Sequence, residues 1–92
     1  MLVSNMRSLK GNPVPNQYII SDENCVIFQS YETTIAIFSN HVMTVGGFWD
    51  YSKSTSKYLY MFLSAMIGGT WNKKEVLNAI KDGYIIYNPS MK

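Results

Sequence analysis

The sequence predicts an α+β domain: an antiparallel sheet of four to five strands, in the element order ββββααβ, with two helices packed on one face. Two observations support this prediction. Residues 18–45 contain runs of β-branched and aromatic residues separated by turn-forming residues, which is typical of a strand meander. Residues 49–69 instead repeat apolar residues at the spacing of one helix face and end in two glycines. With 92 residues, the chain has the length of one domain.

The first 17 residues are expected to form an extended arm, which leaves residues 18–92 as the single domain. Pro13 and Pro15 fix their own φ angles and bias the residues before them toward extended geometry. Chain termini are also poorly packed more often than other segments. The alternative is one short helical turn packed against the domain, made by the apolar residues near the start, which are Leu2, Val3, Met6 and Leu9.

Four strands are expected in the meander, at residues 18–21, 25–31, 33–38 and 41–45. If Ser39 and Asn40 close a two-residue hairpin between the last two strands, Phe38 lies opposite His41. The cross-strand pairs are then Ile37 with Val42 and Ile35 with Thr44 on one face, and Ala36 with Met43 and Thr34 with Val45 on the other.

Both faces of this hairpin are rich in apolar residues. A sheet with one face in water usually shows a cleaner alternation of apolar and polar residues than this sequence does. We therefore expect the face away from the helices to be covered by the arm, by a second copy of the chain or by a partner. A homodimer is one of these expectations.

The central helix is expected within residues 49–69. Its apolar residues recur at the i, i+3, i+4 and i+7 positions that lie on one side of a helix. Side-chain oxygens at the start can accept hydrogen bonds from the first amides, and a glycine pair at the end can adopt the positive φ of a helix stop. The stripe is Leu59, Phe62, Leu63 and Met66, the candidate caps are Asp50, Ser52 and Ser54, and the stop is Gly68–Gly69.

A second helix is expected between Asn72 and Gly83. Asn72 and Glu75 have the spacing of a capping box, and Trp71 and Val76 have that of a hydrophobic staple. Val76, Leu77 and Ile80 are expected to face inward. Residues 84–87 then form a last short strand at the edge of the sheet.

Catalytic and metal-binding signatures are missing from the sequence. His41 is the only histidine and Cys25 the only cysteine, so neither a zinc pattern nor a catalytic triad can be assembled. The hydroxyl run of residues 52–56 follows no glycine elbow and is better explained by helix capping. We expect a protein that is not an enzyme and that has no catalytic residue, metal or cofactor.

Charge and composition point to a reducing compartment and only weakly to nucleic acid. Eight basic and six acidic residues give a formal charge of +2, and they are scattered along the sequence. Binding to duplex DNA usually needs basic residues concentrated on one face. A lone cysteine among apolar neighbours is typical of a buried thiol, and neither a leader nor an apolar segment long enough to span a membrane is present. We expect a cytosolic protein without membrane contact.

The outward side of the central helix is the predicted binding surface. Lys53, Lys57 and Tyr60 follow one another at steps of three and four residues, and Tyr51 precedes them near the helix start. Aromatic residues of this kind favour protein interfaces, and they also stack on unpaired bases whose phosphates pair with lysines. The candidate partner-binding residues are Tyr51, Lys53, Lys57 and Tyr60, and the alternative is an ordinary solvated helix face.

The chain resembles a group of small proteins encoded by bacteriophages of low-GC bacteria. The similarity lies in residues 14–18, in residues 28–31 followed by Ile35 and Ala36, and in residues 49–52 followed by Thr55, Lys57, Tyr58, Phe62 and Leu63. These motifs carry no known reaction, so the resemblance transfers no catalytic residue.

The resemblance implies the cytoplasm of an infected bacterial host as the setting. Small phage proteins without catalytic residues usually act by binding, and inhibitors of host defence such as anti-CRISPR proteins are a prominent class. The function expected from it is a non-catalytic protein that inhibits or modulates a host protein or ribonucleoprotein complex. The alternative is a nucleic-acid-binding phage accessory protein.

Overall fold

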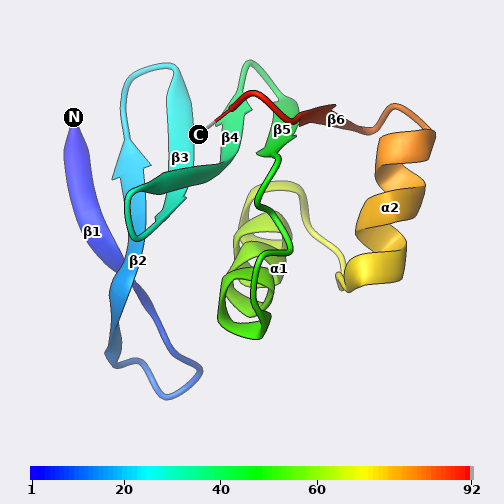
Figure 1. Ribbon diagram of the computed structural model, residues 1–92. Coiled ribbons are helices and arrows are strands. Elements are labelled where there is room, and N and C mark those ends of the chain that lie inside the picture. The colour runs from blue at the N-terminus through cyan, green and yellow to red at the C-terminus, as the bar shows by residue number, and fades with distance from the viewer. Residues whose placement is uncertain (92) are drawn as a thin grey trace.

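A computed structural model describes residues 1–91 of the chain. Over these residues six strands and two helices form one α+β unit, in which the sheet lies across one side of the central helix (Figure 1). The elements are β1 (Leu2–Arg7), β2 (Pro13–Ser21), β3 (Cys25–Ser30), β4 (Thr33–Ser39), β5 (Val42–Gly46), α1 (Lys53–Ile67), α2 (Lys73–Lys81) and β6 (Ile85–Asn88).

The sheet is mixed rather than purely antiparallel, and within residues 1–91 it has six strands instead of four or five. The strands are neighbours in chain order from β1 to β6, and each pair up to β5 is antiparallel. β6 pairs with β5 in parallel, as Met43 opposite Ile85 shows. Because both helices lie between these two strands in the sequence, the chain crosses over and returns in the same direction. The edge position expected for the last strand is confirmed.

The expected N-terminal arm is wrong, because this segment is part of the sheet. β1 pairs with β2 from Leu2 opposite Ser21 to Arg7 opposite Pro13. The two prolines suggested a broken strand, since proline cannot donate a ladder hydrogen bond. They lie, however, in the part of β2 that extends beyond β3, whose pairing begins only at Gln17. This part of β2 therefore has no strand on its β3 side among the described residues, and proline is tolerated at such an edge.

The β4–β5 hairpin has a two-residue turn, but the turn is one residue later than predicted. Asn40 and His41 both have positive φ, 52° and 65°, and Ser39 pairs with Val42. The tight turns that suit strand twist need positive φ at both central residues, and Asn and His adopt it more readily than Ser does. The predicted pairing of Phe38 with His41 is therefore wrong, and Phe38 pairs with Met43. Ala36, Met43 and Val45 still lie on the same face of the hairpin, as predicted.

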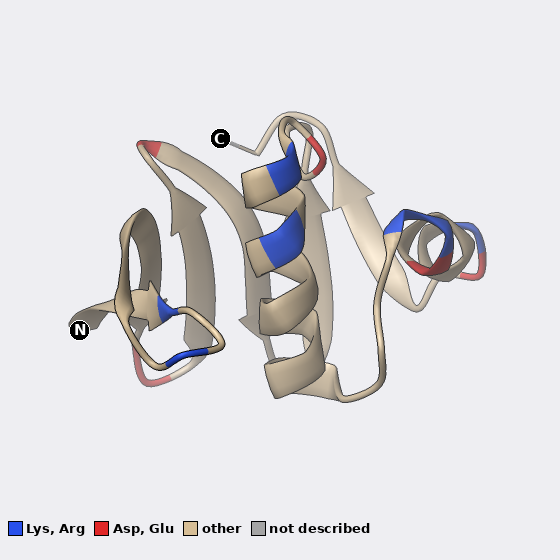
Figure 2. Ribbon diagram, turned by 90° about the horizontal axis from the view of Figure 1, so that it is seen from below, with Lys and Arg blue, Asp and Glu red and all other residues tan. Residues whose placement is uncertain are grey.

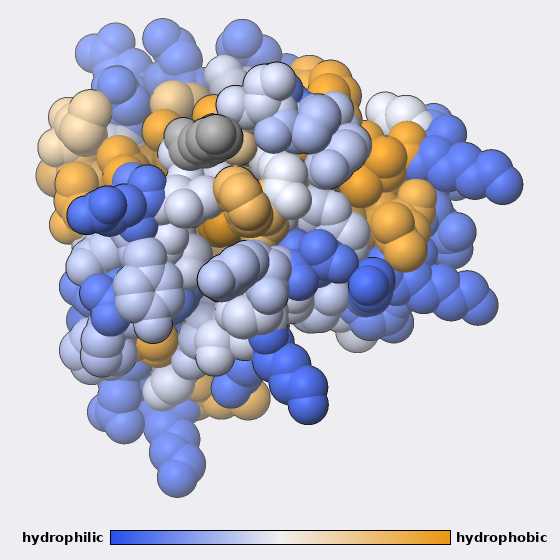
Figure 3. Space-filling model, viewed as in Figure 1, coloured by the Kyte–Doolittle hydropathy of each residue, from blue (hydrophilic) through white to orange (hydrophobic). Residues whose placement is uncertain are grey.

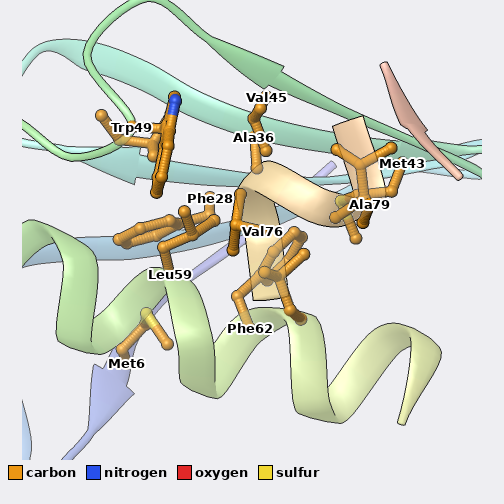
Figure 4. Packing of buried hydrophobic residues seen from close by; sticks show 13 residues of the cluster. Met6, Phe28, Ala36, Met43, Val45, Trp49, Leu59, Phe62, Val76 and Ala79 are labelled. Carbon is orange, nitrogen blue, oxygen red and sulfur yellow. The ribbon is translucent and has the colours of Figure 1, made fainter. Parts of the chain in front are cut away.

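The core lies between the sheet and the two helices. Figure 4 shows the side chains of α1 directed toward the sheet, where the rings of Phe62 and Phe28 lie 5.9 Å apart. The predicted helix stripe is confirmed, since Leu59, Phe62 and Leu63 are at most 1% exposed. The cluster consists of Met6, Phe28, Ile35, Ala36, Met43, Val45, Trp49, Leu59, Phe62, Leu63, Val76, Ala79 and Ile85.

Both helices begin with the caps that the sequence suggests. Ser52 Oγ accepts a hydrogen bond from the Thr55 amide, and Asn72 Oδ1 accepts one from the Glu75 amide. Gly68, with a φ of 76°, ends α1. The inward orientation predicted for Leu77 is wrong: it is exposed, and Ala79 takes the buried position. Because α2 is short and lies beside the sheet edge, it buries a narrower stripe of residues than the sequence pattern predicted.

The sheet face opposite the helices carries one apolar row. The residues paired across it, in strand order, are Val3, Ile20, Ile27, Ile37, Thr44 and Ile86. No helix of the described residues covers this face. Figure 3, which has the view of Figure 1 and does not look onto this face, shows apolar side chains near β1 and near α2 on the side turned to the viewer. We call this row and its face the open face.

Candidate functional site

A shallow groove of about 670 Å³ runs along the outer side of α1, and all four predicted partner-binding residues line it. Leu9 of the β1–β2 loop and Lys73 of α2 contribute to its lining, and Figure 2 shows these two segments on either side of α1. We call it the helix groove. Its lining residues are Leu9, Asp50, Tyr51, Ser52, Lys53, Ser56, Lys57, Tyr60, Met61 and Lys73.

The four predicted residues differ in exposure. Tyr51 is 76% exposed, and both lysines are exposed. Tyr60 was expected to be an exposed aromatic, but it is half-buried and packs against the core cluster. Its ring therefore forms part of the groove floor, and Tyr51 is the aromatic side chain that a partner would contact first.

The groove is basic in the part of the chain that the structure describes. Lys73 Nζ forms an ion pair with Asp50 Oδ2 at 3.2 Å, which neutralises one positive charge. Lys53 and Lys57 form no ion pair with a described residue, and Lys57 Nζ lies 5.5 Å from the centre of the Tyr58 ring. The first turn of α1 has no acidic residue, so the positive end of the helix dipole adds to this field. The arrangement favours an anionic partner.

Basic residues from three segments of the chain lie on this side of the fold, with acidic residues beside those of α2. Figure 2 shows the basic residues on the β1–β2 loop, on the first turns of α1 and on α2. Lys10 lies in the loop and Arg7 at the end of β1, where its Nη1 donates a hydrogen bond to the Gly11 carbonyl at 2.9 Å. Sequence analysis found no cluster because these three segments are far apart along the chain.

A second hollow of about 550 Å³ continues the helix groove toward the end of α1. The two hollows share Leu9, Tyr60 and Met61. Trp71 lines the far end, where its Nε1 donates a hydrogen bond to the Gly68 carbonyl at 2.7 Å. Sequence reasoning missed Leu9, Met61 and Lys73 as groove residues because each comes from a different element or lies beside the predicted stripe.

A third hollow, of about 610 Å³, lies between α1 and the β3–β4 turn, and we call it the aromatic hollow. Phe48 and Tyr51 meet edge to face, with ring centres 5.9 Å apart, and Tyr51 and Ser52 line the helix groove as well. Hydroxyl groups line it also: Thr55 Oγ1 accepts a hydrogen bond from Ser52 Oγ at 3.1 Å. The lining residues are Ser30, Tyr31, Thr33, Ile35, Phe48, Tyr51, Ser52 and Thr55.

Residues 1–91 show neither a candidate metal site nor a helix that could span a membrane. No three His, Cys, Asp or Glu side chains come together there in a way that could hold a metal ion. His41 lies in the β4–β5 turn, exposed, with its ring edge-on to Phe38 at 6.4 Å between centres. Over the same residues, neither helix has the length and apolarity to cross a membrane.

The fold and these surfaces define a small α+β domain with a basic, aromatic groove on its helical side. A family model described as a family of unknown function, DUF8033, matches residues 1–80, which include the sheet up to β5, all of α1 and most of α2. The chain belongs to this DUF8033 family. No curated protein and no solved structure matches the chain.

Proposed function

We propose that this chain is a non-catalytic binding protein that acts by covering a functional surface of a larger complex through the helix groove. The observation that supports the proposal is the convergence of Tyr51, Lys53 and Lys57 with residues of two other segments in one groove. Exposed aromatic residues give contact area at low entropic cost, and lysines without ion-pair partners attract acidic surfaces.

The resemblance to small phage proteins supplies the setting of the proposal. In that setting the partner is a host protein or ribonucleoprotein complex in the cytoplasm of an infected bacterium, and binding inhibits or modulates it. Inhibition of a CRISPR complex is one form of this activity. A groove without catalytic groups suits an inhibitor that occupies a surface, since such a protein needs only contacts.

The test is a capture experiment with a matched pair of variants. Tagged wild-type protein should recover a specific complex from host lysate in stoichiometric amount. Tyr51→Ala combined with Lys57→Glu should reduce this recovery at least about tenfold, because the loss of a hot-spot residue at an interface costs about 2 kcal/mol or more. Mass spectrometry and quantitative blotting measure the recovery.

The control for that experiment changes the same residue types outside the groove. Tyr84 and Lys81 are exposed and line none of the hollows described above, so Tyr84→Ala with Lys81→Glu should leave recovery unchanged. Equal recovery by both double variants would contradict the groove as the binding surface.

Binding to nucleic acid by itself is a second candidate function. Lys53 and Lys57, which line the groove without an ion-pair partner among the described residues, favour it. Affinity for single strands should then fall as salt rises, because each neutralised phosphate releases counterions. Affinity that does not change between low and high salt would rule out a mode led by phosphate contacts.

Self-association through the open face is a further proposal about partners. Its row from Val3 to Ile86 is apolar except for Thr44. The two members on the edge strands are exposed, Val3 at 61% and Ile86 at 49%. Ile37→Lys places a charge at the centre of the row and should convert a dimer to a monomer. Light scattering at tens of micromolar measures this, and Asn78→Lys on exposed α2 is the control of equal charge. A monomeric wild-type protein would contradict the proposal.

A further inference from the structure

We propose that the aromatic hollow binds one unpaired base of a single-stranded nucleic acid whose phosphates lie along Lys53 and Lys57 in the adjoining helix groove. This inference rests on the second candidate function, nucleic-acid binding, and names the part of the ligand that the surface beside the helix groove would hold.

The walls of the hollow are suited to stacking. Tyr31 is 63% exposed and Phe48 43% exposed, and both stand at the hollow together with Tyr51. Bases stack on such rings whatever their sequence, because every base has a π-face. None of the residues that line the hollow carries a charge at neutral pH, and its volume of about 610 Å³ falls within the range of small-molecule sites. These features select an uncharged planar group.

The floor of the hollow offers hydrogen bonds that the described residues leave incomplete. Ser30 and Thr55 are 4% and 3% exposed, and their hydroxyl oxygens lie 3.2 Å apart. Ser52 donates to Thr55 Oγ1, so three hydroxyl groups make two mutual hydrogen bonds, and one hydroxyl hydrogen stays available whichever way the chain is oriented. A hydrogen-bond acceptor on a base edge could use it.

A buried acceptor without a partner lies on the same sheet face as this floor. Gln17 pairs with Ser30 across β2 and β3, so the two side chains lie on the same sheet face. Gln17 is 3% exposed, and its Oε1 has no hydrogen-bond partner among the described residues. Leaving a buried acceptor unpaired costs about 1–3 kcal/mol. Gln17 is not among the residues that line the hollow, so this acceptor lies behind the floor, and the hydroxyl groups of Ser30 and Thr55 are the polar groups that a base would meet.

The phosphate positions follow from the boundary between the two hollows. Tyr51 and Ser52 line both of them. The sugar-phosphate backbone of a nucleotide whose base stacks on Tyr51 would therefore enter the helix groove. Lys53 and Lys57 lie there one helical turn apart, and the first turn of α1 adds no acidic side chain. A neutral pocket beside a basic groove has the charge pattern of a nucleotide: an uncharged base next to an anionic phosphate.

Tyr31 occupies a backbone conformation that does not suit its residue type. Its φ is 56°, in the left-handed region that favours Gly and Asn over bulky side chains. The β3–β4 turn would therefore form more easily with Asn at this position. A tyrosine held in this conformation, with its ring exposed at the hollow, is consistent with a contact role.

The experiment uses fluorescence anisotropy with the full chain and a labelled 20-nucleotide oligothymidylate at low salt. Tyr31→Asn and Tyr51→Ala should each weaken binding about 5- to 150-fold, the range of one lost base stack. Tyr31→Asn should not lower the melting temperature, because Asn relieves the positive φ. Lys57→Gln should weaken binding and flatten its salt dependence, whereas Tyr84→Ala should change neither.

Two results would overturn the inference. One is the absence of binding to the oligonucleotide at low salt, and the other is binding that Tyr31→Asn and Tyr51→Ala leave unchanged. Either result leaves the proposed function standing if the Tyr51→Ala, Lys57→Glu variant still fails to capture the complex. The groove would then contact a protein surface of the partner. Loss of capture specificity with intact, tyrosine-dependent oligonucleotide binding would instead contradict the proposed function and support the base site.

Discussion

Phe62→Ala should destabilise the fold by about 3–5 kcal/mol, the cost of removing a fully buried aromatic side chain. Phe62 is 1% exposed and its ring packs on Phe28, so the cavity would open where α1 meets the sheet. The total free energy of unfolding of a small domain is only about 5–15 kcal/mol. The loss should lower the melting temperature by about 15 °C or more.

Urea denaturation followed by circular dichroism measures this change as a free energy of unfolding. Lys74→Ala, an exposed change on α2, is the control and should alter stability by less than about 0.5 kcal/mol. A Phe62→Ala protein that unfolds at the same urea concentration as the wild type would show that the packing of α1 on the sheet differs from the one described.

Gly46→Ala should be the second strongly destabilising change, at about 1–3 kcal/mol. A Cβ atom at this position would lie 2.9 Å from the Met91 carbonyl oxygen and 3.1 Å from that of Thr34. Both neighbours are backbone atoms, which cannot rotate away as a side chain could. The end of β5 can therefore carry only glycine while the chain after β6 lies against it.

A double-mutant cycle separates the two clashes. Shortening the chain after Asn88 removes Met91 but not Thr34, so Gly46→Ala should cost less in the shortened chain than in the full one. Thermal unfolding of the four proteins gives the coupling. Equal costs in both backgrounds would mean that the segment after β6 does not lie against Gly46.

Local patterns predicted the elements that depend on local chemistry. The stripe of α1, the Asn72 cap and the last strand could be read from spacing and residue type, because each is fixed by a few neighbouring residues. The β1–β2 hairpin could not, since Pro13 and Pro15 are acceptable in a strand only where one edge lacks a partner. Whether this edge of β2 lacks a partner depends on how far β3 extends, and that is determined by the tertiary structure.

The candidate site was predictable to the same extent. Helical spacing placed Lys53 and Lys57 on one face of α1, where the structure has them. The spacing could not show that Leu9 and Lys73 complete the groove, because they arrive from other elements. Nor could it show the aromatic hollow, whose floor joins Ser30 of β3 to Thr55 of α1. Contacts between distant segments carry no signature in a single sequence.

The parallel pairing of β5 with β6 has a consequence for the order of assembly. The strands from β1 to β5 are joined by short turns, so each can pair with its neighbour soon after it is synthesised. β6 must instead close a loop that contains both helices, a step with a larger entropic cost. While residues 85–88 are still inside the ribosome, Met43 and Val45 lack the edge strand beside them. We expect the nascent chain to need shielding by chaperones until that last strand has emerged.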